Sequence, residues 1–278
     1  MQAPCLVLCS IHDRSAVRVY CALRKRLGAD AVELVSGEEL ALAPRWHHVL
    51  DSGNVGTELT LSDGRRIASD RVAVVFQRMQ QLDMPQFERS KPDDREYAVT
   101  EMQALLLSWL AGLSCPVVNR ASPRGLCGAD RSRLEWMTLA ARAGLPTRGS
   151  ELVSEARRFR RPELVPHLAT HNGTEADDPP PILRPDLLGR APIQYLEPVD
   201  GPQRRVLVAG GRCLNLPPGV STEACTGVAD LSGDHLLEIS LGRVRGAWRF
   251  CSATPLPEIP PEAADFVADS LAEMRVAA

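Results

Sequence analysis

The fold of this chain is decided near its C-terminus by the stretch LEISLGRVRGAWRFCSATPLP, which runs from Leu237 to Pro257. Two strand-like runs flank a turn at Gly246, and the second run leaves through Pro255 and a second proline. Strand, glycine turn and strand in succession are typical of a β-hairpin. A Pro-x-Pro segment ends the second strand because proline cannot donate to a ladder of hydrogen bonds. We therefore predict a hairpin here, followed by a last helix over residues 261–274.

Length and charge limit what the chain can be. Its 278 residues exceed the usual size of one domain, so we expect two subdomains around a shared core. A net charge of −3 gives no general attraction to nucleic acid or to an anionic membrane, and we expect neither partner. The first residues lack the basic start of a signal peptide, and no run of about 18 apolar residues exists to cross a bilayer. We predict a cytoplasmic protein.

The cysteines favour core packing over metal binding. None of the eight belongs to a Cys-x-x-Cys pair, and most lie in apolar segments, where a thiol behaves as a small core residue. His167 and His171 have the i, i+4 spacing of a helical metal site, but the sequence shows no third ligand. We therefore expect no metal, and reduced, mostly buried thiols at Cys5, Cys9, Cys21, Cys115, Cys127, Cys213, Cys225 and Cys251.

The first 117 residues are predicted to form an α/β unit. Apolar runs at residues 5–10 and 72–76 lack polar alternation, which is typical of strands buried on both faces. Asp13 or Ser15 can cap the helix that the apolar periodicity predicts up to Leu27. The remaining expected elements are strands at 31–35 and 115–118, a meander over 47–67 and a long helix over 96–113.

Two segments in the middle of the chain have informative patterns. The first is SCPVVNRASPRGLCGADRSRLEWMTLAARAGLPT, in which Asn119 follows a strand-like run, Asp130 and Arg131 open a helix, and Gly144 ends it. The second is DLLGRAPIQYLEPVDGPQRRVLVAGGRC, which begins at residue 186 and ends at Cys213. In the second segment, an Ala-Pro pair and a glycine turn lead into a strand-like run.

Together with the hairpin, these segments resemble the ATP-grasp family in the family's own order. The nearest family members by this resemblance are carboxylate–amine ligases, including those that crosslink or extend ribosomal peptides. The resemblance implies an α/β fold in which residues 1–117 form a pre-ATP-grasp βαβ domain. Residues 118–278 would form an ATP-grasp-like domain. The further matching positions are Ala140 to Pro146, Ala191, Pro192, Gly201, Val206, Gly210 and Trp248.

The resemblance also implies where the metal ligands of the family would lie. The family hairpin carries an Asp, a Glu and an Asn, and here Ile239, Ser252 and Thr254 take their places. Mg²⁺ needs hard oxygen ligands, chiefly carboxylates and phosphates, so we expect these three positions to have lost the metal. Glu238 is expected to face away from Ile239 because neighbours in a strand alternate. The acids considered as substitutes are Asp230, Asp234 and Glu238.

The sequence assigns no catalytic residue, but four residues are candidates for binding a nucleotide or substrate. Arg131 stands where the family usually has a lysine for the phosphates, and no lysine follows Lys91. Gln194 lies in the segment that follows the adenine edge in the family, and Glu197 is the nearest acid to the position after it. Arg205 can bind a carboxylate or a phosphate as a bidentate fork.

The stretch over residues 151–181 departs from the family pattern, which has a strand–loop–strand cover for the triphosphate. Here it is short and polar, with a helix expected at 154–159 and a Gly/Asp/Pro linker at 172–181. We expect a shortened phosphate-covering subdomain over about 150–181. A solvated helix face, or less favourably a contact for an acidic partner, is expected for Arg157, Arg158, Arg160 and Arg161.

These observations lead to two function hypotheses. The first is a pseudoenzyme, an ATP-grasp-like protein whose Mg-ATP site is eroded and which needs no cofactor. It would bind a peptide, a small carboxylate or a partner enzyme within a biosynthetic or maturation pathway. The alternative is an active ATP-dependent carboxylate–amine ligase that uses ATP and Mg²⁺ through rearranged ligands. An enzyme that reuses the cleft without a nucleotide is a weaker third hypothesis, and the sequence leaves a homodimer open.

Overall fold

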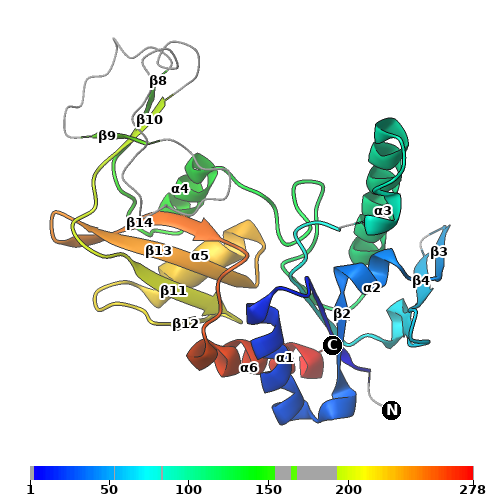
Figure 1. Ribbon diagram of the computed structural model, residues 1–278. Coiled ribbons are helices and arrows are strands. Elements are labelled where there is room, and N and C mark those ends of the chain that lie inside the picture. Colours follow the sequence, from blue (N-terminus) through cyan, green and yellow to red (C-terminus); the bar gives the residue numbers. More distant parts are fainter. Residues whose placement is uncertain (1–2, 53, 83, 154–163, 168–192, 278) are drawn as a thin grey trace. The chain divides into compact units, whose positions relative to one another are not determined.

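The computed structural model describes residues 3–52, 54–82, 84–153, 164–167 and 193–277 (Figure 1). The α/β class is confirmed, since parallel and antiparallel sheets alternate with helices. The chain divides into two compact units. Unit 1 contains Met1–Asp130, Asp234–Leu236 and Pro255–Ala278, and unit 2 contains Arg131–Gly233 and Leu237–Thr254.

Unit 1 is built on a four-stranded parallel sheet. Its strand order is β2-β1-β6-β7, so β1 lies inside the sheet between β2 and β6. Every residue of β1 is buried, as its uninterrupted apolar sequence predicts. The strands are β1 (Cys5–Cys9), β2 (Val32–Ser36), β6 (Val74–Gln77) and β7 (Val117–Val118).

Helices α1 (Arg14–Leu27) and α6 (Pro261–Ala277) pack against each other in unit 1, where α1 contacts β1 and β2 and α6 contacts β6. Asp13 caps α1 by accepting a hydrogen bond from Ala16 N at 2.9 Å, so the cap is Asp13 rather than Ser15. The predicted C-terminal helix is confirmed, but it belongs to unit 1. Its apolar residues are buried in the same unit as those of α1.

The second large group of elements in unit 1 is the predicted meander with the long helix. The meander is a separate antiparallel sheet of order β3-β4-β5, and Trp46 of β3 meets Trp109 of the helix edge-to-face at 5.6 Å. His48 lies between Thr57 Oγ1 at 2.7 Å and Ser108 Oγ at 2.9 Å. The elements are α2 (Gly37–Ala41), β3 (Arg45–Asp51), β4 (Asn54–Thr60), β5 (Arg66–Ala68) and α3 (Pro92–Gly112), with 3₁₀ turns η1 (Ala29–Ala31), η2 (Ser69–Arg71) and η3 (Pro85–Phe87).

Unit 2 contains an antiparallel sheet of order β12-β11-β13-β14, with α4 and α5 packed against it. The predicted hairpin is confirmed as β13 and β14. Its two-residue turn has positive φ at Arg245 (53°) and Gly246 (80°), a conformation that suits the right-handed twist of the paired strands. The elements are α4 (Arg133–Arg142), β11 (Arg204–Ala209), β12 (Arg212–Leu214), α5 (Thr222–Ser232), β13 (Leu236–Val244) and β14 (Ala247–Thr254).

A small antiparallel sheet of order β8-β10-β9 completes unit 2. In this sheet β8 (Ser150–Val153) and β9 (Val165–His167) both pair with β10 (Ile193–Leu196). The helix expected at 154–159 with its four arginines, His171, the linker at 172–181 and the Ala191-Pro192 pair lie outside the described residues.

The side chain of Asn119 forms hydrogen bonds with the segments at which the chain enters and leaves the hairpin. Its side chain is almost fully buried, and its φ of 55° is one that asparagine adopts more readily than most residues. Its Oδ1 accepts from Leu236 N at 3.0 Å, and its Nδ2 donates to Leu236 O at 2.8 Å and to Pro255 O. Leu236 begins β13 and Pro255 follows β14, so one amide side chain in unit 1 holds both segments.

In the described part of the chain, no helix combines the length and the apolarity that a membrane crossing requires.

Candidate functional site

One polar surface of unit 2 lies on the sheet face opposite to the helix-covered core. Antiparallel pairing sets Glu238 opposite Thr254 and Ser240 opposite Ser252, so these four side chains share one face of β13 and β14. We call this surface the hairpin face. All four residues are partly exposed, whereas the alternate residues of both strands are buried.

This register corrects the sequence alignment at one position. Ile239 pairs with Ala253, and both are buried in the core of unit 2. Strand residues alternate between faces, so Ile239 cannot lie with Ser252 and Thr254. The expectation that Ile239 stands at a metal position beside them is therefore wrong. Glu238, which was expected to face away, occupies the hairpin face.

Arg205 is the candidate that the structure brings to this face. It lies on β11, next to β13, and its Nε is 3.7 Å from Glu238 Oε1. The Arg205 side chain is 65% exposed and that of Glu238 is 15% exposed. Solvent screens such a pair, so its contribution to stability is small. Nearby, Ser240 Oγ donates a hydrogen bond to Gln203 Oε1.

Arg131 contacts both helices of unit 2, α4 and α5. It stands directly before Ser132, the N-cap of α4, and its Nη2 donates to Ser232 O at 2.5 Å. Ser232 is the last residue of α5, where a cation complements the partial negative charge of the helix end. The guanidinium also lies over the ring of Trp136 at 5.0 Å. These contacts give Arg131 a structural role.

Gln194 and Glu197 lie together at the small sheet. Gln194 is buried on β10, and its Nε2 donates to Ser150 Oγ at 3.0 Å. Glu197 Oε2 accepts from Gly149 N at 2.9 Å, and its Oε1 is 3.2 Å from Arg245 Nη2 in the hairpin turn. Both candidates therefore join β10 to neighbouring segments.

The four candidates thus lie at three separate places in unit 2, and sequence reasoning missed two charged residues beside them. Glu238 was missed as a member of the hairpin face because the alignment was shifted by one residue. Arg148 was missed because it is one arginine among many. It is 5% exposed, and its Nη1 donates to the main-chain oxygen of Glu197 at 3.5 Å.

The donor set of the hairpin face does not fit the metal site that the family resemblance implies. It offers one carboxylate, which Arg205 already shares, and the hydroxyls of Ser240, Ser252 and Thr254, of which that of Ser240 is bound to Gln203. Protein-bound Mg²⁺ takes carboxylates together with phosphate oxygens and water. Within the described ranges, no group of three His, Cys, Asp or Glu side chains is arranged to hold a metal ion. Of the other acids considered as substitutes, Asp230 is exposed on α5, and Asp234 is buried and belongs to unit 1.

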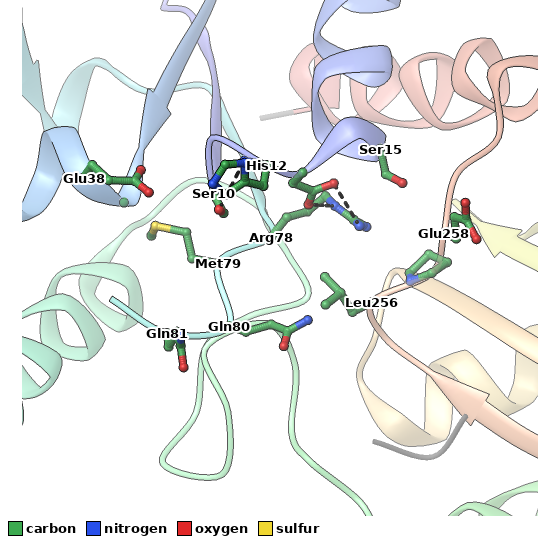
Figure 2. A pocket seen from close by; sticks show the side chains of 13 residues that line it. Ser10, His12, Ser15, Glu38, Arg78, Met79, Gln80, Gln81, Leu256 and Glu258 are labelled. Atoms are coloured by element: carbon green, nitrogen blue, oxygen red, sulfur yellow. Dashed lines mark hydrogen bonds and ion pairs between the residues drawn. The ribbon is translucent and has the colours of Figure 1, made fainter. Parts of the chain in front are cut away.

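A second polar site lies within unit 1, at the carboxyl ends of three parallel strands. A cavity of about 500 Å³ opens where β1 leads into Ser10, β2 leads into Gly37 and Glu38, and β6 leads into Arg78 (Figure 2). Ligands of open parallel sheets bind at such strand ends, where connections leave β1 toward one neighbour and return on its other side. We call this cavity the strand-end pocket. Its lining residues are Ser10, His12, Asp13, Ser15, Gly37, Glu38, Arg78, Met79, Gln80, Gln81, Leu256, Pro257 and Glu258.

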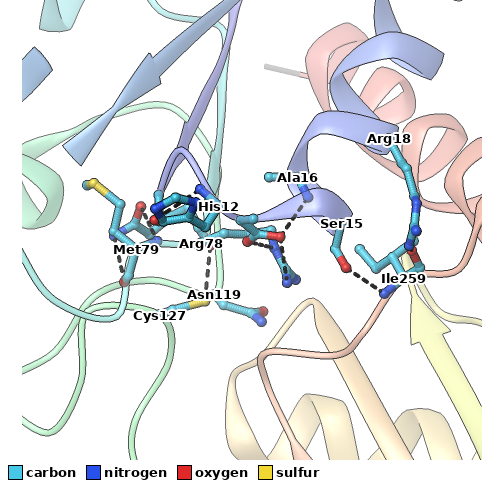
Figure 3. Close-up of polar contacts among 12 residues, drawn as sticks. His12, Ser15, Ala16, Arg18, Arg78, Met79, Asn119, Cys127 and Ile259 are labelled. Carbon is cyan, nitrogen blue, oxygen red and sulfur yellow. Dashed lines mark hydrogen bonds and ion pairs between the residues drawn. The ribbon is translucent and has the colours of Figure 1, made fainter. Parts of the chain in front are cut away.

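An ion pair with little solvent exposure organises the strand-end pocket. Arg78 Nε donates to Asp13 Oδ2 at 2.7 Å and Arg78 Nη2 donates to Asp13 Oδ1 at 3.4 Å, while Asp13 also caps α1 (Figure 3). Two atoms beside it are less well satisfied. Within the described part of the chain, Arg78 Nη1 and Glu38 Oε2 are buried without a hydrogen-bond partner. Each such group costs about 1–3 kcal/mol when nothing pairs with it.

Cys9, the last residue of β1, directly precedes Ser10 of the pocket lining, and its thiol is buried. Burial, and secondly the charge of Asp13, raise the pKa of Cys9 to about 12, although Arg78 opposes the rise. Cys9 is therefore a neutral core thiol, which is the role that the cysteine pattern predicts. The late segment that lines the pocket is held by α1, because Ile259 N donates to Ser15 Oγ at 2.9 Å and Arg18 Nη1 donates to Ile259 O at 2.8 Å (Figure 3).

Solved structures that resemble this chain over nearly its whole length are ATP-grasp ligases. A RiPP-associated ATP-grasp ligase of Chryseobacterium gregarium, in complex with ADP and a leader and core peptide, is similar with a TM-score of 0.73 at 13% identity, covering 98% of this chain and 97% of that chain. The macrocyclase MdnC of Microcystis aeruginosa, bound with precursor peptide MdnA, has a TM-score of 0.72 at 14% identity, with 97% and 99% covered. The ATP-grasp ligase PsnB, complexed with a minimal precursor, has a TM-score of 0.72 at 19% identity, with 98% and 99% covered.

These comparisons define the fold class. The chain has the ATP-grasp fold that the three sequence segments predict. A comparison with protein-family models finds no match, and neither does a comparison with curated protein sequences.

Proposed function

We propose that this protein is a peptide-binding pseudoenzyme of the ATP-grasp fold, acting in the modification or maturation of a peptide. The observation that carries the proposal is the donor set of the hairpin face. Where the family resemblance implies two carboxylates and an amide, this face presents Glu238 beside Arg205, together with the hydroxyls of two serines and a threonine. In-line phosphoryl transfer depends chiefly on metal and cation electrostatics, so losing these donors removes its main source of catalysis.

A peptide is the favoured ligand because the similar structures contain one. The ligase of C. gregarium is bound to a leader and core peptide, MdnC to the precursor peptide MdnA, and PsnB to a minimal precursor. The sequence hypothesis also allowed a small carboxylate or a partner enzyme. The fold similarity supports the peptide among these three, and it covers nearly all of each chain.

The first test is calorimetry of the full chain with ATP, with and without Mg²⁺. A ligand at about one hundred times its Kd stabilises a protein by about 2.7 kcal/mol, so a thermal shift measured in parallel would detect binding. We expect no binding that depends on Mg²⁺. The matched control is the double variant Ser252→Glu, Thr254→Asn, which restores a carboxylate and an amide and is expected to gain metal-dependent nucleotide binding.

The peptide half of the proposal has its own test. A displayed peptide library selected on the immobilised full chain is expected to yield a consensus sequence whose Kd is unchanged by ATP and Mg²⁺. Release of ADP and phosphate in the presence of that peptide would overturn the pseudoenzyme. Failure to select any consensus from repeated libraries would overturn the peptide ligand.

One observation favours the active ligase as the second candidate. Glu238 keeps a carboxylate on the hairpin face, and Mg²⁺ in phosphoryl-transfer sites is held by as few as one or two carboxylates plus substrate phosphates. ATP and Mg²⁺ would be the cofactors of such an enzyme. Under this hypothesis, Glu238→Gln abolishes metal-dependent ATP binding in the same calorimetry, whereas Glu101→Gln on α3 leaves it unchanged.

A further inference from the structure

The strand-end pocket of unit 1 is not used by the proposed function, yet it has the properties of a binding site. Its volume of about 500 Å³ falls in the range of small-molecule sites. Three parallel strands direct their carboxyl ends and following residues into it. Arg78 lines it while only 6% exposed, and the Nη1 of Arg78 has no hydrogen-bond partner in the described residues.

The charges that line the pocket favour a cationic ligand group. Asp13 is already satisfied by Arg78 and by the first turn of α1. The remaining charged carboxylates in the lining are Glu38 and Glu258, and His12 is the other titratable residue there. Glu258 takes part in contacts of its own, so Glu38 is the carboxylate that a bound ammonium or guanidinium group would neutralise. Glu38 Oε2 is buried without a partner, so it is the acceptor that such a group would satisfy.

The two unsatisfied atoms lie in different parts of the pocket. In Figure 2, Glu38 lies on one side near Met79, whereas the guanidinium of Arg78 points toward the other side, where Leu256 and Glu258 enter. Gln80 lies at another edge of the pocket, beside Leu256, and offers an amide that can both donate and accept. A matching ligand would carry its cation at the Glu38 side and an oxygen acceptor at the Arg78 side.

We propose that the strand-end pocket binds a basic amino acid, either free or as a residue of a peptide. Its side-chain cation would pair with Glu38, its aliphatic stem would lie along Met79, and its carboxylate or carbonyl oxygen would accept from Arg78 Nη1. The free amino acid and the peptide residue both provide a side-chain cation and an oxygen acceptor. The free amino acid presents a carboxylate to Arg78, and the peptide residue presents a main-chain carbonyl. The inference rests on unit 1 alone and does not require the hairpin face to be inactive.

The test is calorimetry of the full chain with L-lysine, L-arginine, L-norleucine and the capped residue N-acetyl-lysine amide. Norleucine has an aliphatic side chain without the terminal charge, so it isolates the contribution of the cation. We expect lysine or arginine to bind and norleucine to bind at least about tenfold more weakly, a difference of about 1.4 kcal/mol. Binding of the free amino acids alone identifies that source, and binding of the capped residue identifies a peptide.

Two variants locate the site. Glu38→Gln removes the proposed partner of the cation with little change in shape, and it is expected to weaken lysine binding about tenfold or more. Gln80→Arg adds a positive charge at an exposed position of the lining, where it would repel the cation of the ligand. It is therefore also expected to weaken lysine binding about tenfold or more, without disturbing the core. The matched control is Glu101→Gln, which removes one carboxylate from an exposed position of α3 and is expected to leave binding unchanged.

The outcomes separate this inference from the proposed function. It is overturned if lysine and norleucine bind alike, if none of the probes binds at about 10 mM, or if both pocket variants bind lysine as the parent does. None of these results bears on the ATP calorimetry or on the selected peptide consensus. A selected consensus rich in basic residues that loses affinity in Glu38→Gln would join the two proposals at one site.

Discussion

The ion pairs of the strand-end pocket and of the hairpin face differ in how far solvent reaches them. In the pocket, Arg78 and Asp13 form an ion pair in which the side chains are 5% and 15% exposed. On the hairpin face, Arg205 is 65% exposed and reaches Glu238 only at 3.7 Å. Desolvated charges persist only when their partners are well placed, whereas exposed charges tolerate loose geometry. Removing one member of the buried pair is therefore expected to destabilise unit 1, whereas the hairpin face can lose donors at little cost.

The largest expected difference between the two units is in thiol reactivity. Burial raises the pKa of Cys9 beneath the pocket to about 12, whereas a hydrogen bond from Cys225 lowers the pKa of the half-buried Cys213 on β12. Only the thiolate reacts, so at about pH 8 we expect iodoacetamide to label Cys213 faster than Cys9 by on the order of a thousandfold. Peptide mapping by mass spectrometry measures both rates. Equal rates would show that the pocket does not shield Cys9.

The next prediction removes the charge of Asp13. Asp13→Asn keeps a side chain that can cap α1 but leaves Arg78 without its counter-ion in a buried site. We expect the free energy of unfolding to fall by about 3 kcal/mol, measured by urea denaturation. Asp30→Asn, at an exposed position of η1, is the control and should change stability by less than about 0.5 kcal/mol. A loss equal to that of the control would mean that the pocket is solvated like the hairpin face.

The sequence predicts most of the fold because the fold follows from periodicity and turn chemistry. The apolar runs at Cys5–Cys9 and Val74–Gln77, the cap at Asp13 and the turn at Gly246 all lie as expected. These features depend on neighbouring residues, which a single sequence displays. The placement of the C-terminal helix in unit 1 could not be predicted in this way, because it depends on contacts with α1, far away in the sequence.

The candidate sites were less predictable because they depend on strand register and on the pairing of strands that are distant in the sequence. On the hairpin, a shift of one residue exchanges the two faces of a strand, so aligning Ile239 instead of Glu238 reversed the expected donor set. The strand-end pocket combines residues from β1, β2 and β6, and only the pairing of those strands brings Glu38 and Arg78 to one cavity. A usable signal was present, since a polar residue follows each of these three strands within two positions.

A smaller effect is expected where the hairpin face meets its neighbouring segment. A methyl group added at Gly242 of β13 would lie 2.4 Å from Val199 Cγ1 and 2.9 Å from Cys251 Sγ. We expect Gly242→Ala to destabilise the protein by about 2 kcal/mol through overpacking, measured by urea denaturation. Combining it with Val199→Ala should recover part of that loss beyond the sum of the single changes. An unchanged stability in Gly242→Ala would show that Val199 moves freely over this part of the sheet.

The smallest effect is expected at Arg205, and it tests the comparison most directly. Arg205→Leu removes the cation from the hairpin face, and solvent screens its pair with Glu238, so the loss of stability should stay below about 1 kcal/mol. Arg204→Leu, the exposed neighbour on β11, is the matched control. If Arg205→Leu instead costs about as much as Asp13→Asn, the carboxylate of Glu238 depends on its cation as strongly as Asp13 and Arg78 depend on each other. The hairpin face would then be a constrained polar site, which could not lose its donors without a large loss of stability.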